Sequence, residues 1–88
     1  MSILSEAAAL IGGDRQADYG DADTSFTRIS VFWSAYLGHR IRPHDVAAMM
    51  TLLKLSRIAG DPTKRDSWTD AAGYIALGGQ LTTKEEEA

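Results

Sequence analysis

Three aspartates stand where their carboxylates could hold a divalent metal ion. Asp66 and Asp70 are four residues apart, so both carboxylates share one face of a helix, where like charges repel each other. A cation of the protein or a bound metal is therefore expected to compensate them. Magnesium prefers oxygen ligands, and Asp45 would add a third carboxylate if its helix runs antiparallel to the helix of the other two.

Two of the aspartates also have a simple structural interpretation. Asp66 could cap its own helix, and Asp45 could favour the positive end of an earlier helix. Asp70 lies a full turn inside its helix, where neither explanation applies. Its role therefore stays open between structure and function, whereas helix capping is the simpler role for the other two.

Lys54 and Arg57 lie about one helical turn apart and could bind a phosphate group. Arginine makes bidentate contacts with oxyanions, and lysine supplies a point charge. The same two cations could instead form ion pairs between helices with Asp66 and Asp70. The two interpretations are compatible, because a site can hold its own ion pairs while it is empty.

A polar loop over residues 14–22 carries two further candidate ligand contacts, Arg15 and Tyr19. Tyr19 could stack on a base or a sugar, and Gly20 after it would let the backbone approach a ligand closely. Alternatively, Tyr19 packs on the core and pins the loop to it. The sequence contains no glycine-rich phosphate loop and no nucleophile elbow.

The apolar periodicity predicts an all-α fold, with a short N-terminal helix and three main helices. The expected helices cover residues 3–11, from 23 or 24 to 37, 43–59 and 66–81. Residues 1–81 would form a single small helical bundle, and residues 82–88 an acidic flexible tail.

The helix over residues 43–59 has two apolar faces. One consists of Val46, Met49, Met50 and Leu53, and the other of Ala48, Leu52, Leu55 and Ala59. A helix that is apolar on two sides is buried on two sides, and one short chain offers too few partner helices to cover both. The last helix adds a face of small residues, suited to close packing. A homo-oligomer, most simply a symmetric dimer, is therefore expected.

The composition indicates one small globular domain. The 88 residues are 44% hydrophobic and include no cysteine, which leaves no disulfide and no thiolate metal site. No apolar run reaches transmembrane length, and the N-terminus lacks the basic region of a signal peptide, so a cytoplasmic location is expected. The net charge of −3 argues against a dedicated nucleic-acid-binding protein.

Four segments together resemble a family of small proteins common in bacteriophages and prophages. They are GDRQADYG at 13–20, SFTRISVFWSAYLG at 25–38, DVAAMMTLLKLSR at 45–57 and DSWTDAAGYIAL at 66–77. The resemblance extends over residues 3–81. It implies a phage-encoded protein and does not by itself imply a function.

The chain also resembles, more weakly, the all-α nucleoside triphosphate pyrophosphohydrolases of the MazG type. Those oligomeric enzymes hold magnesium against the triphosphate with two acidic motifs, ExxE and ExxD, on two helices. The resemblance implies a magnesium site at Asp45, Asp66 and Asp70. The sequence departs from the motifs, because Ala48 replaces one carboxylate and Asp66 and Asp70 are spaced by four residues rather than three.

These features predict a phage-encoded cytoplasmic protein that binds a nucleotide or nucleotide-like phosphate, with magnesium as the implied cofactor. The predicted ligand contacts are Arg15, Tyr19, Lys54 and Arg57. Hydrolysis by a MazG-like mechanism stays open. The alternatives are a nucleotide sponge without catalysis and an interaction module that docks on a host protein.

Overall fold

The computed structural model describes residues 2–12 and 22–87, with side chains as far as Thr83. Arg15 and Tyr19, two of the candidate ligand contacts, lie outside the described residues. Within those ranges the chain forms four helices and no strand, which confirms the predicted all-α fold. The helices are α1 (Ile3–Gly12), α3 (Ala22–Leu37), α4 (Pro43–Gly60) and α5 (Arg65–Glu87).

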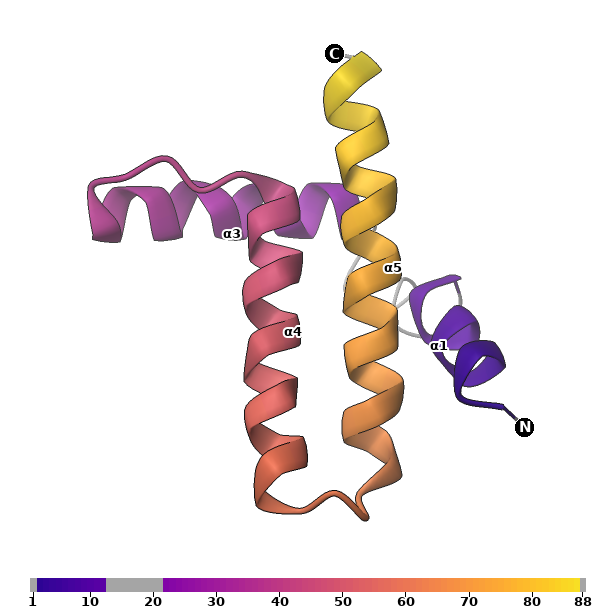
Figure 1. Ribbon diagram of the computed structural model, residues 1–88. Coiled ribbons are helices and arrows are strands. Elements are labelled where there is room, and N and C mark those ends of the chain that lie inside the picture. The colour runs from indigo at the N-terminus through magenta and orange to yellow at the C-terminus, as the bar shows by residue number, and fades with distance from the viewer. Residues whose placement is uncertain (1, 13–21, 88) are drawn as a thin grey trace.

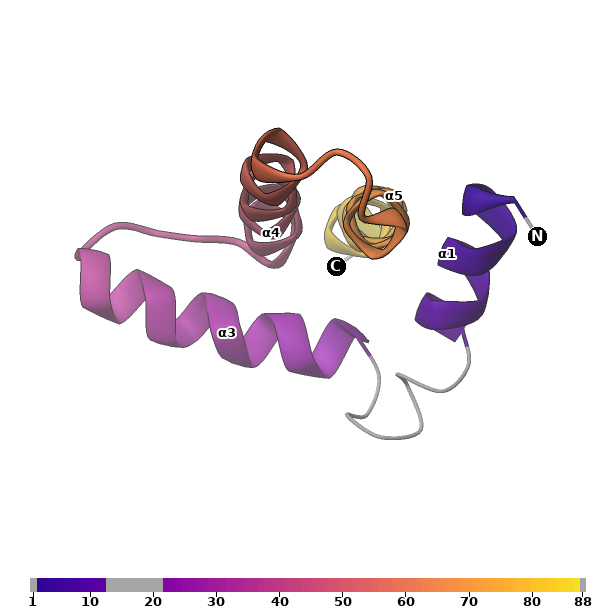
Figure 2. The same ribbon diagram turned by 90° about the horizontal axis from the view of Figure 1, so that it is seen from below.

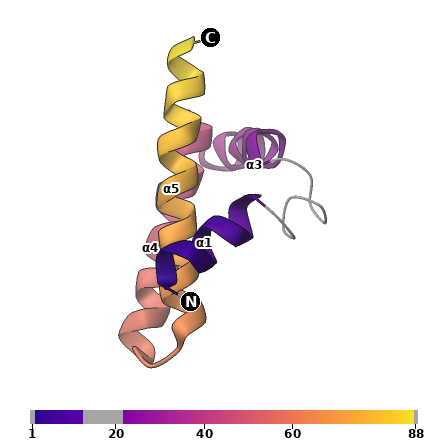
Figure 3. The same ribbon diagram turned by 90° about the vertical axis from the view of Figure 1, so that its right-hand side faces the viewer.

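A hairpin of α4 and α5 forms the centre of the fold. The two helices lie side by side and run in opposite directions, and α3 crosses behind them (Figure 1). Seen from below, α3 lies along one side of the hairpin and leaves the other side open (Figure 2). Helix α1 packs mainly on α5, across its outer side (Figure 3).

The turn between α4 and α5 is short and hydrogen-bonded. The Asp61 N–H donates to the Arg57 carbonyl (2.9 Å) and ends α4 after Gly60. The Asp61 carboxylate then accepts hydrogen bonds from the Thr63 hydroxyl (2.6 Å) and the Thr63 N–H (3.1 Å). These bonds hold the pKa of Asp61 below its usual value because they stabilise the charged carboxylate, and the bond from the hydroxyl has the larger effect. The turn thereby directs α5 back along α4.

The core lies where α3 crosses the hairpin. Its largest fully buried side chain is Val46 of α4. The rings of Phe26 in α3 and Tyr74 in α5 stack with their centroids 6.2 Å apart. The buried cluster consists of Phe26, Val46, Ala47, Tyr74, Leu77 and Leu81. Of the predicted apolar face of α4, Val46 and Met50 pack in the core, whereas Met49 and Leu53 are exposed. The side of the hairpin turned away from α3 contributes nothing to this cluster.

The structure differs from the sequence prediction at two places in α5. The helix continues to Glu87 rather than ending near Leu81, since lysine and glutamate at its end have high helix propensity. The face of small residues expected to pack closely, Trp68, Ala71, Ala72, Ile75 and Gly79, does not include the glycine that meets α4, which is Gly78. A Cβ atom on Gly78 would lie 3.2 Å from the Ala47 Cβ, whereas one on Gly79 would meet nothing within 4 Å.

This pair of glycines gives a matched test of the hairpin packing. Gly79→Ala should raise the free energy of unfolding by about 1 kcal/mol, because alanine is the better helix former. Gly78→Ala should raise the free energy of unfolding by clearly less, or should lower it, because its methyl group would press on Ala47. Urea unfolding monitored by circular dichroism measures both. Equal effects of the two substitutions would contradict the observed packing of α4 on α5.

Candidate ligand-binding site

A cavity of about 480 Å³ lies between α1 and the first turns of α5. Helix α1 comes close to α5 here, since a Cβ on Gly73 would lie 3.4 Å from the side chain of Ile11. Three carboxylates and one guanidinium line the cavity, beside a hydroxyl and two apolar side chains. The lining residues are Glu6, Ala9, Leu10, Arg65, Asp66, Thr69 and Asp70.

Two of the three carboxylates are compensated by cations of the protein. Glu6 of α1 accepts hydrogen bonds from the Arg65 Nε at 2.9 and 3.2 Å. Asp70 forms an ion pair with Lys54 of α4, with 3.0 Å between the Lys54 Nζ and the Asp70 Oδ2. In the described part of the chain, Asp66 has no such partner. With Arg65 in the lining and Lys54 behind Asp70, the three carboxylates of the cavity outnumber their cation partners by one.

The expected repulsion between Asp66 and Asp70 is thus offset by the ammonium group of Lys54. Both partners of the Lys54–Asp70 pair are mostly withdrawn from water, with side chains 17% and 22% exposed. An ion pair in that environment is screened less than one at the surface. Lys54 consequently joins α4 to α5, as one of the two interpretations of the sequence proposed.

Asp45 lies at the other end of the hairpin. Its carboxylate accepts a hydrogen bond from the Arg42 N–H (2.8 Å) and so caps the first turn of α4. Nine residues separate it from Lys54, which is about 14 Å along the helix axis. Within one chain, Asp45 is therefore apart from Asp66 and Asp70. No group of three or more acidic, histidine or cysteine side chains among the described residues is arranged to hold a metal ion.

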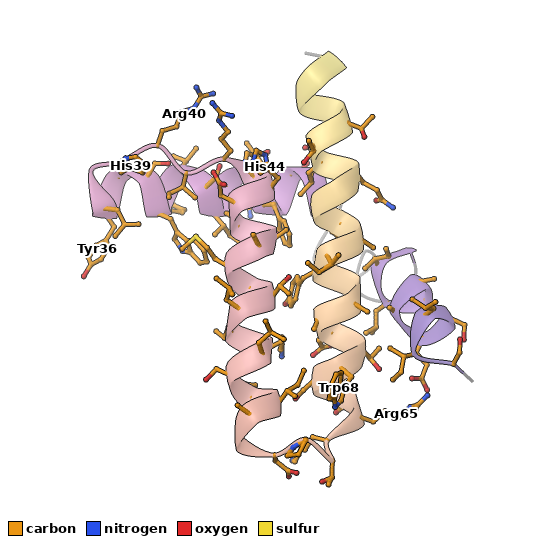
Figure 4. The ribbon with its side chains drawn as sticks, in the orientation of Figure 1. Tyr36, His39, Arg40, His44, Arg65 and Trp68 are labelled. Atoms are coloured by element: carbon orange, nitrogen blue, oxygen red, sulfur yellow. The ribbon has the colours of Figure 1, made fainter. Side chains whose placement is uncertain are left out.

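Arg57 is exposed on α4 and does not line the cavity. Glu6, Thr69 and Arg65 line the cavity, although the sequence pattern did not indicate them. Helical spacing could have predicted Thr69 as a neighbour of the two aspartates, because it lies between Asp66 and Asp70 on the same helical face. No local pattern could have predicted the contact between Glu6 and Arg65, because 59 residues separate the partners. Arg65 lies near the start of α5 and points toward α1 (Figure 4).

The architecture defines a small all-α protein with an acidic cavity between two helices. The chain belongs to the family described as domain of unknown function DUF6378, whose model matches residues 2–82. No solved structure matches it. Among the described residues, no helix is sufficiently long and apolar to cross a membrane.

Two curated relatives come from bacteriophages. The Gene 55 protein of Mycobacterium phage L5 is 41% identical over 88 residues, which are 99% of this chain and 56% of that protein. The Gene 55 protein of Mycobacterium phage D29 is 45% identical over 73 residues, 83% of this chain and 48% of that protein. This chain spans about half the length of the curated relatives it matches. The prediction of a small phage protein family is confirmed.

The Lys54–Asp70 pair can be tested by a double-mutant cycle with Asp70→Asn and Lys54→Met. Asp70→Asn should lower the free energy of unfolding by about 1–2 kcal/mol, because it leaves a half-buried ammonium without its partner. The coupling energy in urea unfolding should be about 1 kcal/mol or more.

The Glu6–Arg65 pair is the matched control, since its arginine is 54% exposed. Glu6→Gln with Arg65→Gln should give a coupling energy below about 1 kcal/mol. A neutral or stabilising Asp70→Asn would instead mean that repulsion by Asp66 outweighs the ion pair.

Proposed function

We propose that this phage protein binds the magnesium complex of a nucleotide-like phosphate in the cavity between α1 and α5, in the cytoplasm of the host cell. The observation that supports the proposal is the charge of the cavity. Asp66 is an uncompensated carboxylate beside two carboxylates that already have cations. Such a site repels a bare phosphate and attracts a cation or an anion that carries one.

The size of the cavity is compatible with this ligand. Small-molecule sites typically measure about 300–1,000 Å³, and this cavity measures about 480 Å³. A smaller apolar hollow adjoins it and shares Leu10 and Asp70 with it. The phosphate end of the ligand would lie at the polar wall, and its less polar part would extend toward this hollow.

Magnesium would be held by few protein ligands. It commonly binds through one or two carboxylates together with phosphate oxygens and retained waters. Asp66 is the available carboxylate, and Asp70 lies one turn further along the same wall. Lys54 would fix the position of Asp70, and Arg65 would place positive charge at the rim. The metal would neutralise the phosphate charge.

Binding without turnover is the form of this function that we favour over MazG-like hydrolysis. Asp45 lies roughly 20 Å along the hairpin from Asp66, so one chain does not assemble the three predicted carboxylates around one ion. The protein would then act as a sponge that sequesters its ligand. Release of pyrophosphate from a nucleoside triphosphate would instead assign it to the hydrolases.

A second candidate function is docking on a host protein, and the exposed apolar side chains of α3 favour it. Phe32 is 66% exposed and Tyr36 is 90% exposed. Tyr36 projects from the far end of α3, away from the hairpin (Figure 4). If no nucleotide binds, this interaction module becomes the leading function.

Thermal unfolding in the presence of nucleotides tests the proposal. Nucleoside di- and triphosphates, and cyclic dinucleotides, should be screened with and without magnesium. A ligand at 100 times its Kd stabilises the folded state by about 2.7 kcal/mol, which raises the Tm of a domain of this size by several degrees. We expect this shift only when magnesium is present.

Asp66→Asn should abolish the magnesium-dependent shift, because it removes the uncompensated carboxylate. Asp61→Asn is the matched control. It makes the same change of charge outside the cavity, and asparagine keeps the oxygen that accepts the hydrogen bonds of Thr63. The proposal fails if no nucleotide shifts the Tm under either condition, or if both variants lose the shift equally.

A further inference from the structure

We propose that the side of the α4–α5 hairpin turned away from α3 binds a second copy of this chain, so that two hairpins stack into a four-helix bundle. We call this side the open face. The inference is independent of the ligand proposed above, because it rests on residues outside the α1–α5 cavity.

The α4 part of the open face consists of Ala48, Leu52, Leu55 and Ala59. These residues follow one another at intervals of four, three and four, the spacing of the core positions in a coiled coil. Val46 and Met50, which pack in the core with α3, lie on the opposite side of the same helix. The α4 stripe therefore points away from α3.

The α5 part consists of Trp68, Ala72, Ile75 and Gly79. The intervals are again four, three and four, so the two helices carry the same pattern. Tyr74 and Leu77, which belong to the core, lie on the other side of α5. Both stripes consequently lie on the same side of the hairpin, and neither contains a charged residue.

These side chains are exposed in the single chain. Leu52, Leu55, Trp68 and Ile75 are 63%, 49%, 46% and 61% exposed. At roughly 200 Å² for a fully exposed large side chain, they present on the order of 400 Å² per copy. Two copies would bury about 800 Å², half of the roughly 1,600 Å² in a standard interface before the small residues are counted. The four large side chains therefore supply about half of the area of a standard dimer interface, and the small residues between them add to it.

The shape of the open face also suits another helical layer. On α5, Ala72 and Gly79 alternate with the large side chains, and on α4, Ala48 and Ala59 flank the two leucines. Small residues let helices approach closely. The Trp68 indole N–H donates to the Pro62 carbonyl (2.9 Å), which fixes the ring on the face with its polar atom satisfied. Large side chains of one copy would insert beside small residues of the other.

A second copy is the occupant that the single chain itself requires. Among the described residues, the buried hydrophobic side chains are Ala7, Phe26, Val46, Ala47, Ala71, Tyr74, Leu77 and Leu81. Three of them are alanines, so the core is small for a chain of 88 residues. A twofold interface needs one patch that is complementary to itself. The open face meets this condition, because each helix contributes both large and small residues at one spacing. Stacking would add a second apolar layer to each copy.

Light scattering at micromolar concentration is the first test. The chain should have twice its mass of 9.5 kDa. Leu55→Glu should give the monomer mass with unchanged helical circular dichroism, because a charge buried in the interface without a partner is strongly unfavourable. Leu4→Glu is the control, since Leu4 is 77% exposed on α1, outside the open face, and it should remain a dimer.

Fluorescence of Trp68 tests the same face without a disruptive variant. In a Trp33→Phe background, emission should shift to shorter wavelength as the concentration rises, because the half-exposed indole becomes buried. A monomer mass for the unaltered chain would overturn the proposal and leave the open face for a different protein. A dimer whose Trp68 emission stays the same when dilution gives the monomer mass, or that persists in Leu55→Glu, would place the interface elsewhere and equally overturn it.

Discussion

The distance between α4 and α5 is the constraint on which the rest of the structure depends. It is set where Gly78 faces Ala47, with so little room that an added Cβ would lie 3.2 Å from the Ala47 Cβ. At this separation the half-buried Lys54 and Asp70 meet at 3.0 Å, and Tyr74 reaches the ring of Phe26. A wider hairpin would weaken both contacts. The close approach of Gly78 to Ala47 thus couples the packing of α4 on α5 to the Lys54–Asp70 ion pair and to the position of α3.

The hairpin has different chemistry on its different sides. Its α3 side holds the buried cluster, and the outer side of α5 carries the acidic cavity with α1. Its open face is apolar and exposed. A ligand and a second copy could therefore bind at once, because the cavity and the open face use different residues of α5. Lys54 connects the two features, since it anchors Asp70 from α4, the helix that also carries half of the open face.

Charges near the cavity stabilise the fold as well as shape the site. The contacts of Glu6 with Arg65 and Thr69 hold α1 on α5, in addition to the packing of Ala7 and Ile11. Asp66, without a partner of its own in the described chain, is the exception. Asp66 lies in the first turn of α5, where the positive end of the helix favours a carboxylate and offsets part of the repulsion from Asp70.

The sequence by itself determined the order of the helices and, to within one residue, the bounds of α4, because these depend on local spacing, on Pro43 at the start of α4 and on the stop at Gly60. It also determined that α4 has two apolar faces, and family membership follows from the sequence alone. Periodicity assigns a residue to a face of its helix, but it does not say what that face meets.

Only the tertiary structure decided which apolar face is buried, that Lys54 pairs with Asp70, and that Glu6 meets Arg65 across 59 residues. It also placed Asp45 at the far end of the hairpin, where it caps α4. These outcomes depend on how far the helices are apart and how they are rotated about their axes. Contacts summed over the whole chain set both quantities, so no local pattern contains them.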